Sequence, residues 1–325
     1  MEWGKIWNKN MKYRDYIIGP EDLLGVPKGY VLAVPEGSNG AVAIPFQGRD
    51  ELYEETLNNL LTWGTPTGGI QWNGLNLRAS TGIPLDLIKA GERPIIYYRE
   101  PTRTLKEPEE LGYPKDFLDK FKKIKTGLVL FCGAQGAGKT TGMMSILRQR
   151  IRLNGERAVT FEAPAEYNIS GQHDQGFIDQ ISVPNEKYFS QCAGISLRMA
   201  SPDIVCYGEI RGFSGVSELC SNAFSSHVVM TTLHSTNIMS GISRFVTFLT
   251  AGEVEHRDYY MKVLSECLKL CVHQKLEWDG KKIRLGIKYL EYTEELRSAI
   301  YSGASSARIS DVLDRQNVMR ANNEL

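Results

Sequence analysis

The stretch that decides the fold is Phe131–Thr141, which reads FCGAQGAGKTT. It fits the phosphate-binding pattern Gly-x4-Gly-Lys-Thr at each fixed position, with Lys139 and Thr140 as the last two. Backbone amides in such a loop point at a phosphate, while the lysine neutralises β- and γ-oxygens and the threonine hydroxyl holds Mg²⁺. The expected nucleotide-binding residues are Gly133, Ala134, Gln135, Gly136, Ala137, Gly138, Lys139, Thr140 and Thr141.

Apolar runs and helical segments alternate around this loop. Strands are expected at 127–132, 158–162, 203–207 and 228–233, and helices at 139–153 and from about 238 to 274. Continuous apolar runs are typical of strands that are buried on both faces. The sequence therefore predicts an α/β fold in which helices cover a mostly parallel sheet. A hairpin over 277–292 and a helix over 294–303 are expected to follow.

The N-terminal part has a different pattern. Two short strands are expected within 29–46, an amphipathic helix over 50–63 and a hairpin over 69–82, which together predict a smaller α+β unit. Prolines and charges gather at 97–114, as is typical of a linker. The predicted organisation is an N-terminal domain over 1–100, a linker over 101–114 and a second domain over 115–325.

Composition narrows the class of protein. The chain has 325 residues, and its 38 Lys and Arg balance its 38 Asp and Glu, so no global field attracts nucleic acid or an anionic membrane. The N-terminus lacks the apolar region of a secretory signal, and no run approaches a membrane span. We therefore expect a cytoplasmic protein. The cysteines form no CxxC pair; Cys267 and Cys271, four apart in a predicted helix, are expected to be core residues.

Acids and histidines follow the predicted strands. Glu162 ends one strand and Glu166 lies four residues later, while Glu209 follows a strand that resembles a Walker B segment with glycine in place of the metal-binding aspartate. His227 and His234 bracket the strand 228–233. His234 is expected at the carboxyl end of that strand, where nucleotides bind in such sheets and where an imidazole could bind a γ-phosphate.

Four motifs in order, GAQGAGKTT, TFEAPAE, PDIVCYGEIR and TTLHSTN, resemble those of the secretion ATPase superfamily, the motors of type II secretion, type IV pili and type IV secretion. The resemblance covers roughly residues 95 to 303. It implies a homo-hexameric ring in which a PAS-like N-terminal domain accompanies a RecA-like P-loop motor domain. It also implies ATP and Mg²⁺ as cofactors, and a peripheral membrane position through an inner-membrane platform protein of a bacterial cell.

The resemblance also implies a role for each site residue. Lys139 and Thr140 are the Walker A pair, and Glu209 is the catalytic Walker B glutamate. Glu162 and Glu166 belong to the Asp box. Of these two, Glu162 takes part in catalysis and in holding the metal. His227 and His234 are the His-box pair. Arg78 and Arg99 resemble the N-terminal-domain arginines that reach the nucleotide and are assigned to catalysis. Two departures, Ala163 in the Asp box and Ser214 after the Walker B segment, argue against fast hydrolysis.

Several machines fit this family. Assembly-type ATPases are longer and carry a tetracysteine zinc element, whereas this chain resembles pilus-retraction ATPases in size and, through Arg297, Ile300 and Gly303, in a C-terminal helix pattern. We therefore expect a hexameric ATPase for pilus retraction, as in twitching motility. The alternatives are a conjugation or Dot-type secretion ATPase, and a weakly hydrolysing regulatory ring subunit. A nucleic-acid translocase is disfavoured because no basic stripe is evident.

Overall fold

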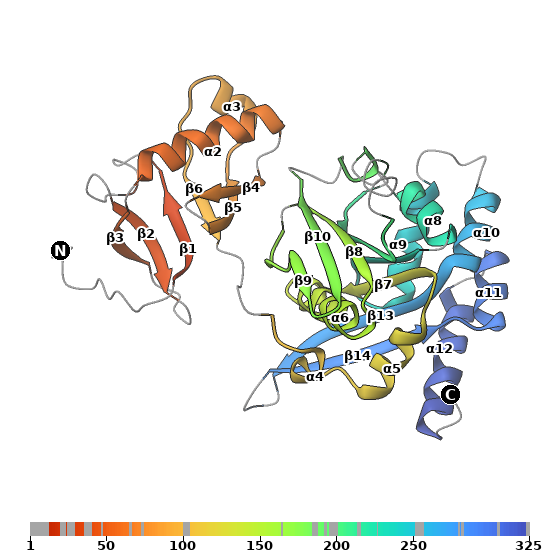
Figure 1. Ribbon diagram of the computed structural model, residues 1–325. Coiled ribbons are helices and arrows are strands. Elements are labelled where there is room, and N and C mark those ends of the chain that lie inside the picture. Colours follow the sequence, from red (N-terminus) through yellow and green to blue (C-terminus); the bar gives the residue numbers. More distant parts are fainter. Residues whose placement is uncertain are drawn as a thin grey trace. The chain divides into compact units, whose positions relative to one another are not determined.

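The computed structural model describes most of the chain (Figure 1). The described residues are 13–19, 24, 30–35, 41–46, 48–64, 67–72, 75–99, 105–163, 165–183, 188–191, 194, 201–212, 216–225, 227–250, 257–278, 280, 283–303 and 306–322. They form two compact units, one of residues 1–103 with 163–168 and 182–185, the other of the remaining residues up to 325. The tips of the two predicted hairpins, at residues 73–74 and at residues 279 and 281–282, lie outside the described residues.

The first unit is built on a six-stranded sheet in the order β3-β2-β1-β6-β5-β4, in which neighbouring strands run antiparallel. Its strands are β1 (Tyr13–Ile18), β2 (Tyr30–Pro35), β3 (Val42–Pro45), β4 (Thr67–Trp72), β5 (Leu75–Thr81) and β6 (Ile96–Arg99). Helices α2 (Arg49–Trp63) and α3 (Leu85–Lys89) complete it. Side chains such as Leu52 and Tyr98 form its core with the inward residues of the strands. The predicted α+β pattern is confirmed.

The second unit contains an eight-stranded sheet in the order β14-β13-β7-β12-β11-β8-β10-β9. The strands are β7 (Gly127–Gly133), β8 (Arg157–Glu162), β9 (Gly171–His173), β10 (Gly176–Ser182), β11 (Ile204–Ile210), β12 (Val228–His234), β13 (Leu268–Trp278) and β14 (Ile283–Glu291). Neighbours among β13, β7, β12, β11 and β8 are parallel, whereas β14 runs antiparallel to β13. The predicted α/β class with a mostly parallel sheet is confirmed.

Helices cover this sheet (Figure 1). Helix α6 packs on β7 and β12, and α8, α9 and α10 pack on one another and on the central strands. Each residue of β7 is buried, so both faces of that strand are covered. The helices are α4 (Pro108–Leu111), α5 (Lys115–Lys123), α6 (Lys139–Asn154), α8 (Val216–Phe224), α9 (Ile238–Thr250), α10 (Arg257–Cys267), α11 (Glu294–Tyr301) and α12 (Ser306–Ala321).

The structure differs from the sequence prediction after residue 267. The segment up to 274 was expected to be helical, but β13 begins at Leu268, and Cys271 lies on this strand. The spacing of the apolar residues in 268–272 fits both a helix and a strand, so the sequence pattern alone does not distinguish the two. Pairing with β7 decides it, because β13 supplies hydrogen-bond partners to one side of that buried strand.

Residues 105–114, the described part of the predicted linker, pack in the second unit. Helix α4 has Pro108 at its first position and a capping box between Glu107 and Glu110. Arg148 on α6 donates to the Leu105 carbonyl at 2.7 Å and to Glu107 at 2.9 Å. Residues 105–114 thus belong to the second unit, because these contacts attach them to α6.

Helix α6 is also fixed at its other end, through Arg150, whose side chain is 2% exposed. The guanidinium binds both oxygens of Glu156, at 2.7 and 2.9 Å, and donates to the Phe121 carbonyl at 3.1 Å. A bidentate pair of this kind fixes geometry as well as charge. It ties the C-terminal end of α6 to the end of α5.

We expect Arg150→Ala to lower the free energy of unfolding by about 3 to 5 kcal/mol, because it leaves a largely buried Glu156 carboxylate without its cation. Urea unfolding monitored by circular dichroism measures this change. Arg157→Ala is the matched control: Arg157 pairs with Asp179 at an exposed position, and its loss is expected to cost less than about 1 kcal/mol. Equal losses for the two variants would contradict the assignment of Arg150 as a structural anchor.

Candidate nucleotide site

The phosphate loop connects β7 to α6 in the second unit. Its first glycine, Gly133, ends β7 so close to β13 that a Cβ there would lie 2.5 Å from the Gln274 carbonyl oxygen. Its last glycine, Gly138, caps α6 with φ 77°, a conformation that L side chains rarely adopt. Both positions therefore require glycine, and the loop presents its backbone at the N-terminus of a 16-residue helix, where anions bind.

Lys139, the first residue of α6, is 6% exposed. Its Nζ donates to the Ala134 carbonyl at 2.9 Å and lies 3.1 Å from Nδ1 of His234. The ammonium has three protons and no acceptor capacity, so it must be the donor in both contacts. The lysine side chain therefore lies across its own loop, as the P-loop pattern predicts.

A series of close polar contacts runs from Lys139 through His234 to Glu209: Lys139 and His234 share a hydrogen bond, and His234 lies within ion-pair distance of Glu209. Because Lys139 donates to Nδ1 of His234, that nitrogen accepts and the imidazole proton is on Nε2. Nε2 lies 2.7 Å from Oε1 of Glu209, and the other oxygen of Glu209 accepts from Arg211 at 2.8 Å. The structure thus brings together the predicted Walker A lysine, the Walker B glutamate and one His-box histidine.

Strand register explains this convergence. His234 pairs with Gly133 across β12 and β7, and Glu209 pairs with Thr232 across β11 and β12. The β11–β12 register shifts at Gly208, whose carbonyl accepts from the Thr232 hydroxyl at 2.7 Å. The irregularity lets the Glu209 side chain reach the carboxyl edge of the sheet, as bulges near functional sites commonly do.

Glu162 ends β8 beside this cluster, and only 2% of it is exposed. Its Oε1 accepts from the Thr160 hydroxyl at 2.9 Å and from the Gln180 amide at 2.7 Å. A Cβ placed on Gly208 would lie 3.3 Å from Cγ of Glu162, so the glycine that replaces the usual Walker B aspartate adjoins this carboxylate. The two acidic motifs of the sequence therefore meet at one place.

The second histidine does not join this cluster. His227 precedes β12, at the opposite end from His234, and its carbonyl accepts from Gly127 at the start of β7. Its Nδ1 lies 2.8 Å from the Pro202 carbonyl. Because β7 and β12 are parallel, this end lies at the amino edge of the sheet, away from the phosphate loop. The structure therefore does not bring His227 together with Lys139, Glu209 and His234, and its role in nucleotide binding stays a prediction.

The remaining predicted residues belong to the first unit. Arg78 and Arg99 are directly opposite each other on β5 and β6. Arg78 Nη1 lies 3.3 Å from Oε1 of Glu166, in the segment 163–168 that groups with this unit. Like charges that face each other across strands repel, so an anion near the two arginines relieves that cost. The structure thus places the two arginines together.

Two residues that support the loop were not predicted from the sequence. Gln274 on β13 donates to the Ala137 carbonyl at 2.7 Å, and Tyr113 donates to Oε1 of Gln274 at 2.6 Å. Burial raises the pKa of Tyr113, so its hydroxyl keeps the proton that it donates. Two other residues on β13 also have shifted pKa values. The contact with Cys132, together with burial, raises the pKa of Cys271. Burial lowers the pKa of His273, and the positive charges of Lys275 and Lys288 lower it further.

The residues fit a magnesium ion that is shared with a nucleotide. In the described part of the chain, no three His, Cys, Asp or Glu side chains form a metal cluster of their own. Mg²⁺ needs no such cluster, because it keeps several waters and binds one or two protein oxygens together with substrate phosphates. The Thr140 hydroxyl on α6 and the buried Glu162 carboxylate offer oxygen ligands of this kind.

The fold and the loop together define a RecA-like P-loop domain. The model of the family described as "Type II/IV secretion system protein" matches residues 70–314, so the chain belongs to this family. No helix in the described ranges combines the length and apolar character that a bilayer crossing requires.

Relatives and solved structures agree with this placement. The chain is 29% identical over 181 residues to a type II secretion system protein E of Xanthomonas campestris pv. campestris, covering 54% of this chain and 30% of the relative. It is 30% identical over 197 residues to the type IV pilus ATPase PilU of Pseudomonas aeruginosa, covering 60% and 50%. The chain thus spans half or less of the length of these relatives.

Among solved structures, the ATPase DotB of Legionella pneumophila has a TM-score of 0.71 at 22% identity, with 94% of this chain and 83% of that chain covered. The pilus retraction motor PilT with bound ADP has a TM-score of 0.71 at 21% identity, with 94% and 86% covered. At these identities the likeness concerns the fold. It confirms the predicted fold class, with an N-terminal domain and a RecA-like domain.

We expect Gln274→Leu to weaken the binding of ADP about tenfold, because the Ala137 carbonyl and the Tyr113 hydroxyl both lose a partner and the loop is no longer held. Isothermal titration calorimetry measures the affinity. Gln149→Leu is the matched control, since Gln149 is equally buried, lies on α6 and binds Glu109 instead of the loop. A similar loss of affinity in both variants would mean that Gln274 acts only through general stability.

Proposed function

We propose that this chain is the subunit of a homo-hexameric, Mg²⁺-dependent ATPase motor that does mechanical work on a type IV pilus. The observation that carries the proposal is the convergence of three side chains at the phosphate loop: Lys139 Nζ lies 3.1 Å from Nδ1 of His234, and Nε2 of His234 lies 2.7 Å from Oε1 of Glu209. It links a group that binds phosphate to a carboxylate of the kind that orients water for in-line attack. Family membership supports an ATPase of pilus and secretion machines.

The chemistry follows from the residues of this chain. Lys139 donates to Ala134 and His234, and phosphate oxygens compete for the same protons when ATP binds. His234 stays beside Glu209, with Nε2 2.7 Å from Oε1 of the carboxylate, and so keeps Glu209 near the loop. Glu209 accepts the proton of the attacking water, and Lys139 stabilises the charge that develops on the transferred phosphoryl group. Bound Mg²⁺, held by Thr140 and Glu162, supplies further charge neutralisation.

The first unit completes the proposed mechanism. We assign residues 1–100 to a PAS-like domain and 115–325 to the motor domain. In this proposal, Arg78 and Arg99 stabilise the triphosphate, and Glu166 binds Arg78 when no triphosphate is near. Loss of the γ-phosphate releases these contacts, and the resulting domain movement performs work. The ring acts at the cytoplasmic face of a bacterial inner membrane through a platform protein.

Two other functions share the same site. A conjugation or Dot-type secretion ATPase would use the same chemistry on another machine, and the likeness of fold to DotB is compatible with it. A regulatory ring subunit that binds ATP but hydrolyses it slowly is favoured by the Ala163 and Ser214 departures. Retention of Glu162, Glu209 and His234 favours hydrolysis instead. The kcat of the purified chain separates these possibilities.

We expect Glu209→Gln to retain ATP binding and to lower kcat about 10²- to 10⁴-fold, because the amide has nearly the shape of the carboxylate but takes no proton from water. Lys139→Ala is expected to abolish binding as well. Phosphate release under saturating ATP and Mg²⁺, together with nucleotide titration, measures both effects. Glu277→Gln, an exposed position paired with Lys275, is the matched control and should leave kcat unchanged. Undiminished turnover in Glu209→Gln would remove this residue from the mechanism.

We expect cells that carry Lys139→Ala in place of the native gene to display more surface pili than the parent, because retraction needs the phosphate site. The measurement is a count of pili per cell by electron microscopy, at matched protein levels. Lys262→Ala, on the exposed side of α10, is the control and should give the parental count. Cells without pili would indicate an assembly motor, and an unchanged count would indicate another machine.

A further inference from the structure

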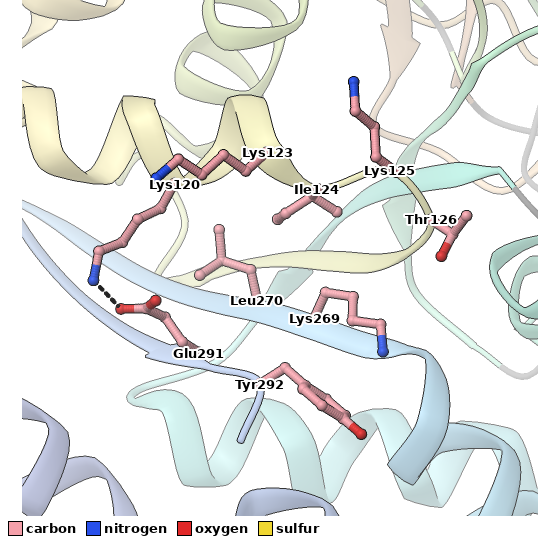
Figure 2. A pocket seen from close by; sticks show the side chains of 9 residues that line it. All are labelled: Lys120, Lys123, Ile124, Lys125, Thr126, Lys269, Leu270, Glu291 and Tyr292. Atoms are coloured by element: carbon pink, nitrogen blue, oxygen red, sulfur yellow. Dashed lines mark hydrogen bonds and ion pairs between the residues drawn. The ribbon is translucent and has the colours of Figure 1, made fainter. Parts of the chain in front are cut away.

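A lysine-lined hollow lies at the edge of the sheet opposite the phosphate loop. Its volume is about 380 Å³, and Figure 2 shows the side chains around it. Lys120 and Lys123 come from the last turn of α5, Lys125 from the segment before β7, and Lys269 from β13. The other lining residues are Ile124, Thr126, Leu270, Glu291 and Tyr292.

The hollow is distinct from the nucleotide site. Lys125 and Thr126 directly precede β7, whereas the phosphate loop follows it. A strand of 7 residues spans roughly 20 Å, so the two sites lie at opposite ends of the same strand. Lys269, at the start of the parallel strand β13, lies at the same edge as Lys125.

The charges in the hollow are only partly balanced. Four lysines and one carboxylate, that of Glu291, line the hollow. Glu291 accepts from Lys120 at 2.8 Å, as drawn in Figure 2, and also from Arg320 at 3.1 Å, so it serves two cations. Lys123 and Lys125 are exposed and have no acidic partner among the described residues. The hollow therefore retains positive charge that no described protein group neutralises.

Helix geometry accounts for some of these lysines but not for all. Cations in the last turn of a helix are favoured by its dipole, which explains Lys120 and Lys123 without a ligand. Lys125 lies beyond α5, and Lys269 is held on another element, with its Nζ 3.8 Å from the centre of the Tyr292 ring and 2.7 Å from the Glu266 carbonyl. Three separate elements thus contribute lysines to the lining of one hollow, which no single helix end requires.

From this we infer that the lysine-lined hollow is a second anion site, which binds a phosphate-bearing group. Lysines are compact point charges with three donors each, and they bind phosphate oxygens in this way at other phosphate sites. The Thr126 hydroxyl at the rim adds a neutral donor. The volume lies within the range of small-molecule sites, so the group is a small phosphate compound or the headgroup of a phospholipid.

The test uses the full chain carrying Lys139→Ala, so that the phosphate loop does not bind the probe. Calorimetry with pyrophosphate and cosedimentation with phosphatidylcholine vesicles containing phosphatidic acid distinguish the free from the lipid source. Lys123→Gln, Lys125→Gln and Lys269→Gln are combined in one variant. The matched control combines Lys89→Gln, Lys115→Gln and Lys262→Gln, which remove the same charge from exposed positions outside the hollow.

We expect the hollow variant to lose at least tenfold in affinity for one of the two probes, and the control to change less than twofold. Loss of pyrophosphate binding supports a small phosphate compound, and loss of vesicle binding supports a lipid headgroup. The inference is overturned if the Lys139→Ala parent binds neither probe, or if both lysine combinations weaken binding equally. Because neither binding measurement depends on ATP hydrolysis, these outcomes are independent of the proposed ATPase activity. Circular dichroism checks that each variant is folded.

Discussion

The pairing of β7 with its two parallel neighbours is the constraint on which the rest of the second unit depends. β12 on one side brings His234 level with Gly133, and β13 on the other side brings Gln274 against the phosphate loop. Each residue of β7 is buried, so its backbone groups must be paired with neighbouring strands. The ladder that satisfies this requirement also sets which side chains surround the loop.

Much of the site could be predicted from the sequence because its signals are local. The phosphate loop combines a fixed spacing with an apolar strand before it and a helix after it, and Glu209 and His234 end apolar runs of their own. Parallel strands present their carboxyl ends at one edge of a sheet, so residues at strand ends meet without knowledge of the exact register. Lys139, Glu209 and His234 meet in this way.

What could not be predicted depends on contacts between distant segments. Gln274 and Tyr113 are 161 residues apart, and neither belongs to a pattern that marks a functional position. The strand that carries Gln274 has an ambiguous apolar spacing, and only the buried edge of β7 gives it strand conformation. The separation of His227 from the loop has another origin: its neighbour in the motif, His234, is seven residues away, which in a strand means the opposite edge of the sheet.

The contact between Gly208 and Glu162 has a consequence for the acidic side chains that the site can hold. A Cβ on Gly208 of β11 would lie 3.3 Å from Cγ of Glu162 on β8, so a side chain at position 208 requires Glu162 to shift. Steric fit therefore couples the residue types that these two neighbouring strands can carry at the site.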